Sequence, residues 1–194
     1  MKSFLIILTV LSLQFSKAGN AYAEYTSQSF IQLADFNGPI DLSAVDVDMI
    51  EAGVFYLSNI YREQKGKSVL TYNENLSDAA YLHSVQMEKY NFFNHVNRKN
   101  RILGTLEKRV LYAGYSNFQT IAENIFYGYI DLSKIGTYKE LCSFIVDNFV
   151  ASKEHRLNIL SNDIKEGGNG IFFESNAKNG FWYFYFTQDF GSQL

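Results

Sequence analysis

The chain has 194 residues, which favours a single domain, and it carries a formal net charge of −3 with a pI near 5.6. Its 17 lysines and arginines are scattered along the chain, so the charge pattern gives no support for nucleic-acid binding. Hydrophobic residues make up 47% of the sequence and include 17 Phe and 14 Tyr. This composition predicts a packed core and excludes a chain that is disordered throughout.

The first 23 residues have the order of a secretory signal peptide. Lys2 precedes the apolar stretch "FLIILTVLSLQF", and "SKAGNAYA" follows with a small-x-small ending, which predicts cleavage after Ala23. The apolar stretch is shorter than the roughly 20 residues that a bilayer-spanning helix needs, and no later run approaches that length. We therefore expect an exported protein without a transmembrane segment in its mature form, located in the periplasm, at the cell surface or outside the cell.

Cys142 is the only cysteine, so the chain can form no internal disulfide. It lies within an apolar helical pattern and is predicted to be a small buried hydrophobic residue. Export without disulfides favours a bacterial protein.

The N-terminal half of the predicted mature chain is mainly helical. Residues 24–45 hold the only proline and show no sustained period, which indicates a leader or linker. Apolar residues then recur every three or four positions from Asp46 to near Gly66, as in an amphipathic helix. A second helix is predicted over 74–90. One of its faces combines five residues, Leu76, Ala80, His83, Met87 and Tyr90.

The stretch 91–121 is rich in Asn and Arg and has one predicted short helix, 105–112. The next helix has a defined start, because Thr137 and Glu140 form a capping-box pair. Its predicted buried stripe comprises Leu141, Phe144, Ile145 and Phe149.

The C-terminal section changes to strands. "GNGIFFES" and "FWYFYFTQDFG" flank the turn signal "NAKNG", a pattern that predicts an antiparallel hairpin. Alternation along the second run places Tyr183, Tyr185 and Thr187 on one face. The other face receives Trp182, Phe184, Phe186 and Gln188. Helices followed by strands indicate the α+β class.

The sequence lacks HExxH, GxSxG, P-loop, dinucleotide-binding and paired CxxC motifs. Four dispersed polar residues remain as candidates: His83, His95 in "NFFNHVN", Glu123 in "TIAENIFYG" and His155 in "SKEHRLNIL". Each also has a structural explanation. His83 suits a satisfied core histidine, His95 a helix-end cap, Glu123 a loop anchor, and His155 a capping or surface cluster.

Five segments, in order and spacing, resemble the bacterial branch of the CAP (SCP) superfamily, named for cysteine-rich secretory proteins, antigen 5 and plant pathogenesis-related proteins. These segments are "LTYNENLSDAAYLHSVQMEKYNFFNH", "AENIFYG", "FVASKEHRLNIL", "GNGIFFE" and "YFTQDFG". The resemblance covers roughly residues 46–191 and assigns residues 46–194 to one such domain. It implies an α-β-α sandwich, in which a small antiparallel sheet lies between helices and a cleft opens on one side.

Many members of that superfamily line the cleft with two His and two Glu, and some bind zinc there. By resemblance, His95 matches the first histidine and Glu123 the first glutamate, whereas Ser152 and Tyr185 stand where the other glutamate and histidine would be. The resemblance also implies that His155 and Arg156 form a pair common in bacterial relatives, in which His155 offers a replacement imidazole to the same cleft. The candidate ligand-binding residues are His83, Ser152, Arg156 and Tyr185. Arg156 also suits a structural pairing with a carboxylate or loop carbonyls.

Two hypotheses remain open. Loss of two tetrad positions favours a binding or interaction module for a lipid, a peptide or a host protein, with no required cofactor. Retention of His95, Glu123 and His155 supports the alternative of an extracellular hydrolase. In that alternative His95 and His155 hold a divalent metal such as zinc, or the three groups act as a base, its orienting carboxylate and a polariser.

Overall fold

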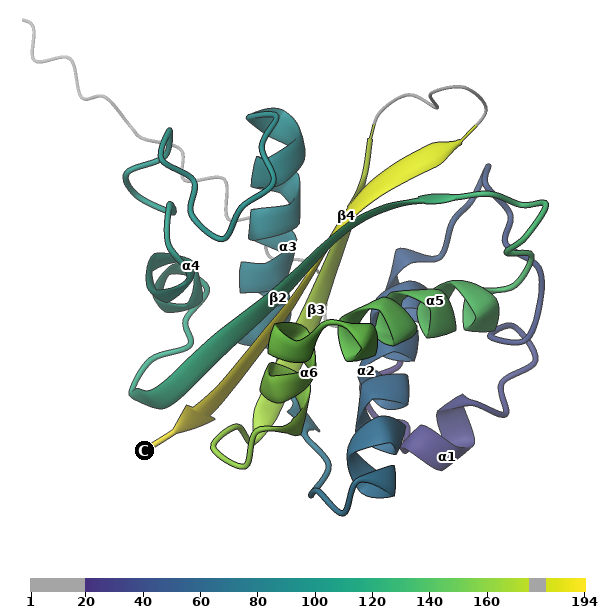
Figure 1. Cartoon of the computed structure of the whole chain (residues 1–194), viewed down its shortest axis with the longest axis horizontal. Helices are drawn as coiled ribbons and strands as arrows, with labels where there is room; N and C mark the ends of the chain where they lie inside the picture. Colours follow the sequence, from purple (N-terminus) through teal and green to yellow (C-terminus); the bar gives the residue numbers. More distant parts are fainter. Residues whose placement is uncertain (1–19, 175–180) are drawn as a thin grey trace, which may run out of the picture.

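The computed structural model describes residues 20–174 and 181–194. Ten elements occur there (Figure 1): α1 Ser27–Phe30, α2 Val47–Gln64, β1 Thr71–Tyr72, α3 Glu74–Lys89, α4 Leu106–Tyr112, β2 Phe118–Ile130, α5 Tyr138–Ala151, α6 Lys153–Leu160, β3 Glu166–Phe173 and β4 Trp182–Gln193. The predicted hairpin turn and most of the predicted signal peptide lie outside the described residues. The signal peptide stays a prediction.

The four strands form one sheet in the order β1-β3-β4-β2. Helices α3 and α4 pack on one face, and α2, α5 and α6 pack on the other, which gives the three layers visible in Figure 1. This arrangement confirms the α+β class and the α-β-α sandwich. The sheet is mixed, because β1 pairs parallel to β3 whereas β3–β4 and β4–β2 are antiparallel.

The three long predicted helices are present as α2, α3 and α5. Asp46 caps α2 by accepting a hydrogen bond from Met49 N, and the Thr137–Glu140 capping box opens α5. The buried stripe of α5 needs one correction, because Phe144 is 39% exposed whereas Leu141 and Phe149 are fully buried. Within the described residues, no helix is long and apolar enough to cross a membrane.

The segment 24–45, predicted as a leader or linker, is packed against the rest of the domain. It contains α1, and its Phe30 and Phe36 are fully buried in the core. Contacts extend further towards the N-terminus, where the Tyr22 hydroxyl donates to Asp46 and the Asn20 amide donates to Asp48 O. Residues that precede the predicted cleavage point therefore contact the start of α2.

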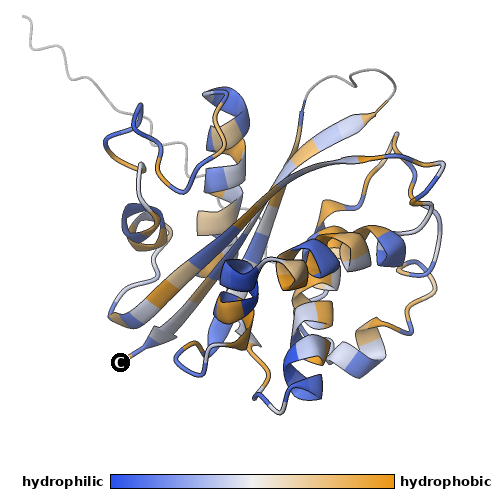
Figure 2. Cartoon of the chain, in the orientation of Figure 1, coloured by the Kyte–Doolittle hydropathy of each residue, from blue (hydrophilic) through white to orange (hydrophobic). Residues whose placement is uncertain are grey.

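The main core lies between the sheet and helices α2 and α5. Figure 2 shows hydrophobic segments through these helices and the strands, whereas most of α6 is hydrophilic. On the opposite face, two glycines of β3 let α3 approach the sheet closely. A Cβ added at Gly168 would lie 2.2 Å from Ser77 N, and one at Gly170 would lie 2.0 Å from Tyr81 N.

Candidate functional site

A buried carboxylate on β2 organises the polar side chains of the α3/α4 face. Glu123 is 7% exposed, and its Oε1 lies 2.8 Å from His95 Nδ1 while its Oε2 accepts from the Arg109 guanidinium. Arg109 lies on α4 and is fully buried. His83, fully buried on α3, places Nε2 3.7 Å from the same Oε1. One carboxylate thus joins residues from three elements and the loop that carries His95.

The surroundings of Glu123 favour its ionised form. Burial alone would raise the pKa of this carboxyl group, but the hydrogen bond from His95 and the positive charge of Arg109 help to hold its pKa below the usual range. An ionised carboxylate only accepts hydrogen bonds, so His95 Nδ1 carries the proton. In the neutral imidazole, Nε2 is then a free acceptor, on a side chain that is 52% exposed.

The same buried residues hold the backbone around His95. His83 Nε2 lies 3.1 Å from Asn94 O, which can only accept, so His83 donates from Nε2. Arg109 Nη1 donates to His95 O at 3.5 Å. Burial lowers the pKa of His83 to about 4, although Glu123 acts in the opposite direction, so His83 is neutral at pH 7. The loop is therefore fixed on both sides of the exposed imidazole.

Asp189 is a fourth buried member of this cluster that the sequence reasoning missed. It lies on β4 directly opposite Glu123 on β2 and is fully buried. Its carboxyl group interacts with the Glu123 carboxylate across the β2–β4 pair. Burial, the neighbouring Glu123 charge and a hydrogen bond with Glu123 raise the pKa of Asp189 well above the usual value, which favours its neutral form. Its position within "TQDFG" in the last predicted strand was the only available signal.

His155 lies apart from this network. It is on α6, where its ring packs edge-on against Phe149 at 5.2 Å between centroids and its backbone carbonyl accepts from Asn124. Burial and then the electrostatic influence of His95 lower the pKa of His155. The structure thus joins His95 to Glu123 by a hydrogen bond but pairs His155 with neither of them.

The remaining candidates have structural roles in the described residues. Ser152 is the junction between α5 and α6, and its carbonyl accepts from Arg156 N. The Arg156 guanidinium donates to the carbonyl of Val150 near the end of α5, in agreement with pairing to backbone carbonyls. Tyr185 is 6% exposed, and its ring lies 4.6 Å from that of Tyr127.

Aromatic rings extend from the His95 loop along the same face of the sheet. Phe93 is 51% exposed, and its ring lies 6.2 Å from that of Tyr127. Tyr127 also stacks on Tyr183 at 5.7 Å, and Tyr183 contacts Tyr129 at 5.4 Å. Exposed Phe93, Tyr127 and Tyr129 therefore form, with Tyr183, a continuous aromatic surface that begins in the loop carrying His95.

These residues do not fit a three-ligand metal centre. Both Glu123 oxygens already accept hydrogen bonds, from His95 and Arg109. Within 20–174 and 181–194, no group of three or more His, Cys, Asp or Glu side chains is placed to hold a metal ion. A catalytic zinc site ordinarily uses three protein ligands.

The model of the cysteine-rich secretory protein (CAP) family matches residues 55–190. The chain belongs to the CAP family. This membership confirms the resemblance found in the sequence.

Relatives of this CAP protein are bacterial. It is 30% identical over 121 residues to the uncharacterized membrane protein YlbC of Bacillus subtilis (strain 168), an alignment that covers 62% of this chain and 31% of that protein. It is similar in fold to an extracellular SCP-domain protein from Bacillus anthracis str. Ames, with TM-score 0.56 and 24% identity over 80% of this chain and 45% of the other. An outer surface protein from Borrelia burgdorferi gives TM-score 0.58 and 15% identity, with coverage of 77% and 97%. The chain thus spans about a third of the curated relative and about half of the Bacillus anthracis chain.

Proposed function

We propose that this CAP protein is an exported binding module that holds a lipid, a peptide or a host protein at His95 and the adjoining aromatic surface. The observation that carries the proposal is the hydrogen bonding of the Glu123 carboxylate. Glu123 is buried and both of its oxygens accept hydrogen bonds inside the domain, so the carboxylate serves to anchor His95. The group left to meet a ligand is the half-exposed His95 imidazole, in the same loop as Phe93, whose ring lies near that of Tyr127.

Replacement of the two other tetrad positions supports the same function. Ser152 connects two helices, and Tyr185 is packed under Tyr127. A reaction that needs four converging acids and bases would lose half of them, whereas a binding surface needs only shape, aromatic area and fixed hydrogen-bonding groups.

A hydrolase remains the second candidate because of one geometric feature. The 2.8 Å contact between His95 Nδ1 and an ionised carboxylate is the arrangement of a general base with its orienting group. This version uses His95 to accept a proton at Nε2 and requires no metal.

Ligand titration followed by NMR tests the proposal. The probes are phosphatidylcholine vesicles and a mixed library of synthetic peptides, and the signals are the His95 ring and the rings of Phe93 and Tyr127. We expect one probe class to shift these signals. Mass spectrometry should show that this probe is not cleaved during incubation. His95→Ala should weaken that binding about tenfold, the scale of one lost charge-assisted or well-ordered hydrogen bond.

His155→Ala is the matched control, because His155 packs on Phe149 and should affect binding little. Cleavage of a probe that is abolished in His95→Ala would instead favour the hydrolase. The absence of both binding and cleavage would reject both functions.

A further inference from the structure

The outer edge of the sheet offers a second binding surface. Strand β2 is the last strand in the order β1-β3-β4-β2, so only one of its edges pairs with another strand. In an antiparallel pair, the N–H and C=O groups of alternate residues point to the partner and away from it. Glu123 O accepts from Asn158 on α6, which shows that odd-numbered residues of β2 direct their backbone groups outward.

Helix α6 covers only one part of this outer edge. Asn158 binds at Glu123 and Asn124, whereas Tyr127 and Tyr129, further along β2, are 38% and 41% exposed. In the described part of the chain, no hydrogen bond engages the outward N–H and C=O groups of these two tyrosines. An exposed row of unpaired backbone groups is a template for another extended chain.

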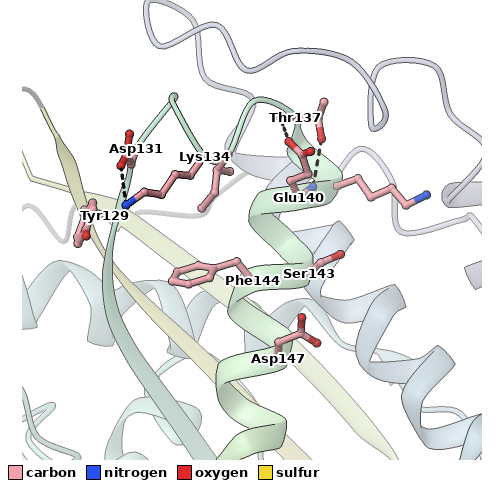
Figure 3. A pocket seen from close by; sticks show the side chains of 10 residues that line it. Tyr129, Asp131, Lys134, Thr137, Glu140, Ser143, Phe144 and Asp147 are labelled. Atoms are coloured by element: carbon pink, nitrogen blue, oxygen red, sulfur yellow. Dashed lines mark hydrogen bonds and ion pairs between the residues drawn. The ribbon is translucent and has the colours of Figure 1, made fainter.

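A groove lies beside this open edge (Figure 3). It has a volume of about 780 Å³ and runs between the end of β2, the following loop and the exposed face of α5. Tyr129, Ile135 and Phe144 supply apolar lining, and Phe144 is the α5 residue that is more exposed than its helical pattern predicts. Side chains from an added strand could enter this groove while its backbone pairs with β2.

Two of the charged side chains that line the groove are available to pair with a charged ligand. Lys134 pairs with Asp131 at 3.4 Å, and Glu140 accepts from the backbone at Gly136 and Thr137. Lys139 and Asp147, also in the lining, lie eight residues apart on α5 and make no ion pair within the described residues. Opposite charges at the two ends of an extended segment would complement them.

We infer that the outer edge of β2 at Tyr127 and Tyr129 binds an extended peptide segment as a fifth strand, with alternate side chains in the groove against α5. An extended backbone is the occupant that satisfies alternating donors and acceptors at strand spacing. The inference goes beyond the proposed function, because it names a second site with a peptide as its ligand. This edge site shares Tyr127 and Tyr129 with the aromatic surface but does not include His95.

The probe is a nine-residue peptide of alternating Val and Thr with Lys at one end and Glu at the other, made in both charge orders. A matched peptide carries N-methyl groups on alternate amides, which removes backbone donors and keeps the side chains. We expect the unmethylated peptide to bind and to slow hydrogen exchange of the Tyr127 amide. The N-methylated peptide should bind at least about tenfold more weakly.

A pair of variants separates backbone pairing from ring contact. Tyr129→Pro removes the ring and the outward N–H but leaves the β2–β4 ladder intact, because proline is tolerated where the N–H faces outward on an edge strand. Tyr129→Val removes the ring and keeps the N–H. With both melting temperatures checked first, Tyr129→Pro should bind about tenfold more weakly than Tyr129→Val.

Equal binding by these two variants, equal binding of the two peptides, or no binding of either charge order would overturn the inference. A peptide that shifts only His95 signals would also overturn it while supporting the proposed function. Protection at Tyr127 that persists in His95→Ala would support the edge site even if the function proposed for His95 failed.

Discussion

The two faces of the β2–β4 pair differ in polarity: one buries aromatic side chains, and the other buries charged and ionisable ones. On the α2/α5 face, Phe126, Phe184 and Phe186 pack with helix residues into the main core. On the α3/α4 face, Glu123 and Asp189 are buried with Arg109 and His83. The α2/α5 face stabilises the fold by apolar burial, which does not depend on pH. The α3/α4 face stabilises it by a charge network, whose contribution depends on protonation. That network also fixes the exposed His95 imidazole.

The largest expected effect comes from breaking the charge network at Arg109. Arg109→Ala leaves the Glu123 carboxylate buried without its cation and should lower the free energy of unfolding by about 3–5 kcal/mol at pH 7. The loss should shrink at acidic pH, because protonation of Glu123 removes the uncompensated charge. Urea unfolding at several pH values measures this dependence.

Phe186→Ala is the matched change on the apolar face. Phe186 is fully buried, so its loss should also cost about 3–5 kcal/mol, but by the same amount at every pH. Parallel pH profiles for the two variants would contradict the distinction between the faces.

A smaller effect is expected from His83, which should make the free energy of unfolding depend on pH. Its pKa is about 4 in the folded protein against a usual value of 6.5, so the unfolded chain binds the proton more strongly. The contribution of His83 to the free energy of unfolding is therefore fully present above about pH 6.5. It declines as pH falls and is lost below about pH 4. The total change should be about 3 kcal/mol.

The variant His83→Gln should flatten this part of the profile, measured by urea unfolding between pH 4 and pH 7. His155 also has a lowered pKa, and its contribution stays in both proteins, so the difference between them isolates His83. Identical slopes would mean that His83 is already protonated in the folded state.

The smallest expected effect is the loss of one neutral hydrogen bond on the α3/α4 face. Ser84 Oγ on α3 lies 2.9 Å from Thr187 Oγ1 on β4, and both residues are fully buried. Thr187→Val should reduce the free energy of unfolding by about 1 kcal/mol, without pH dependence, as measured by thermal unfolding. Thr120→Val, on β2, is the control and should stay within about 0.5 kcal/mol of the unaltered protein.

The apolar face was largely predictable from sequence. Periods of three to four residues located α2, α3 and α5, and the alternation in the last run correctly separated Tyr185 and Thr187 from Phe184 and Phe186. These patterns are local, because side-chain direction repeats with a fixed period in helices and strands. The capping box at Thr137 was confirmed for the same reason.

The charged face was only partly predictable because its contacts join distant segments. Strand β2 was not predicted, since Glu123 and Asn124 interrupt its apolar pattern, and α6 was missed because its sequence is mainly polar. Family resemblance selected His95 and Glu123 correctly as neighbours. It did not reveal Arg109, which lies 14 residues from Glu123 in sequence and within the predicted short helix, or the neutral Asp189.

The two glycines of β3 have a consequence for the electrostatics of the domain. Because Gly168 and Gly170 carry no side chains, the backbone of α3 rests directly on the sheet. That contact leaves no water layer between helix and strands, so the charge on Glu123 acts through a medium of low polarisability. A methyl group at either position would separate the two layers, admit solvent and weaken the hold on the His95 loop. The absence of two side chains thereby helps to set the dielectric environment of the buried Glu123 carboxylate, which holds the imidazole.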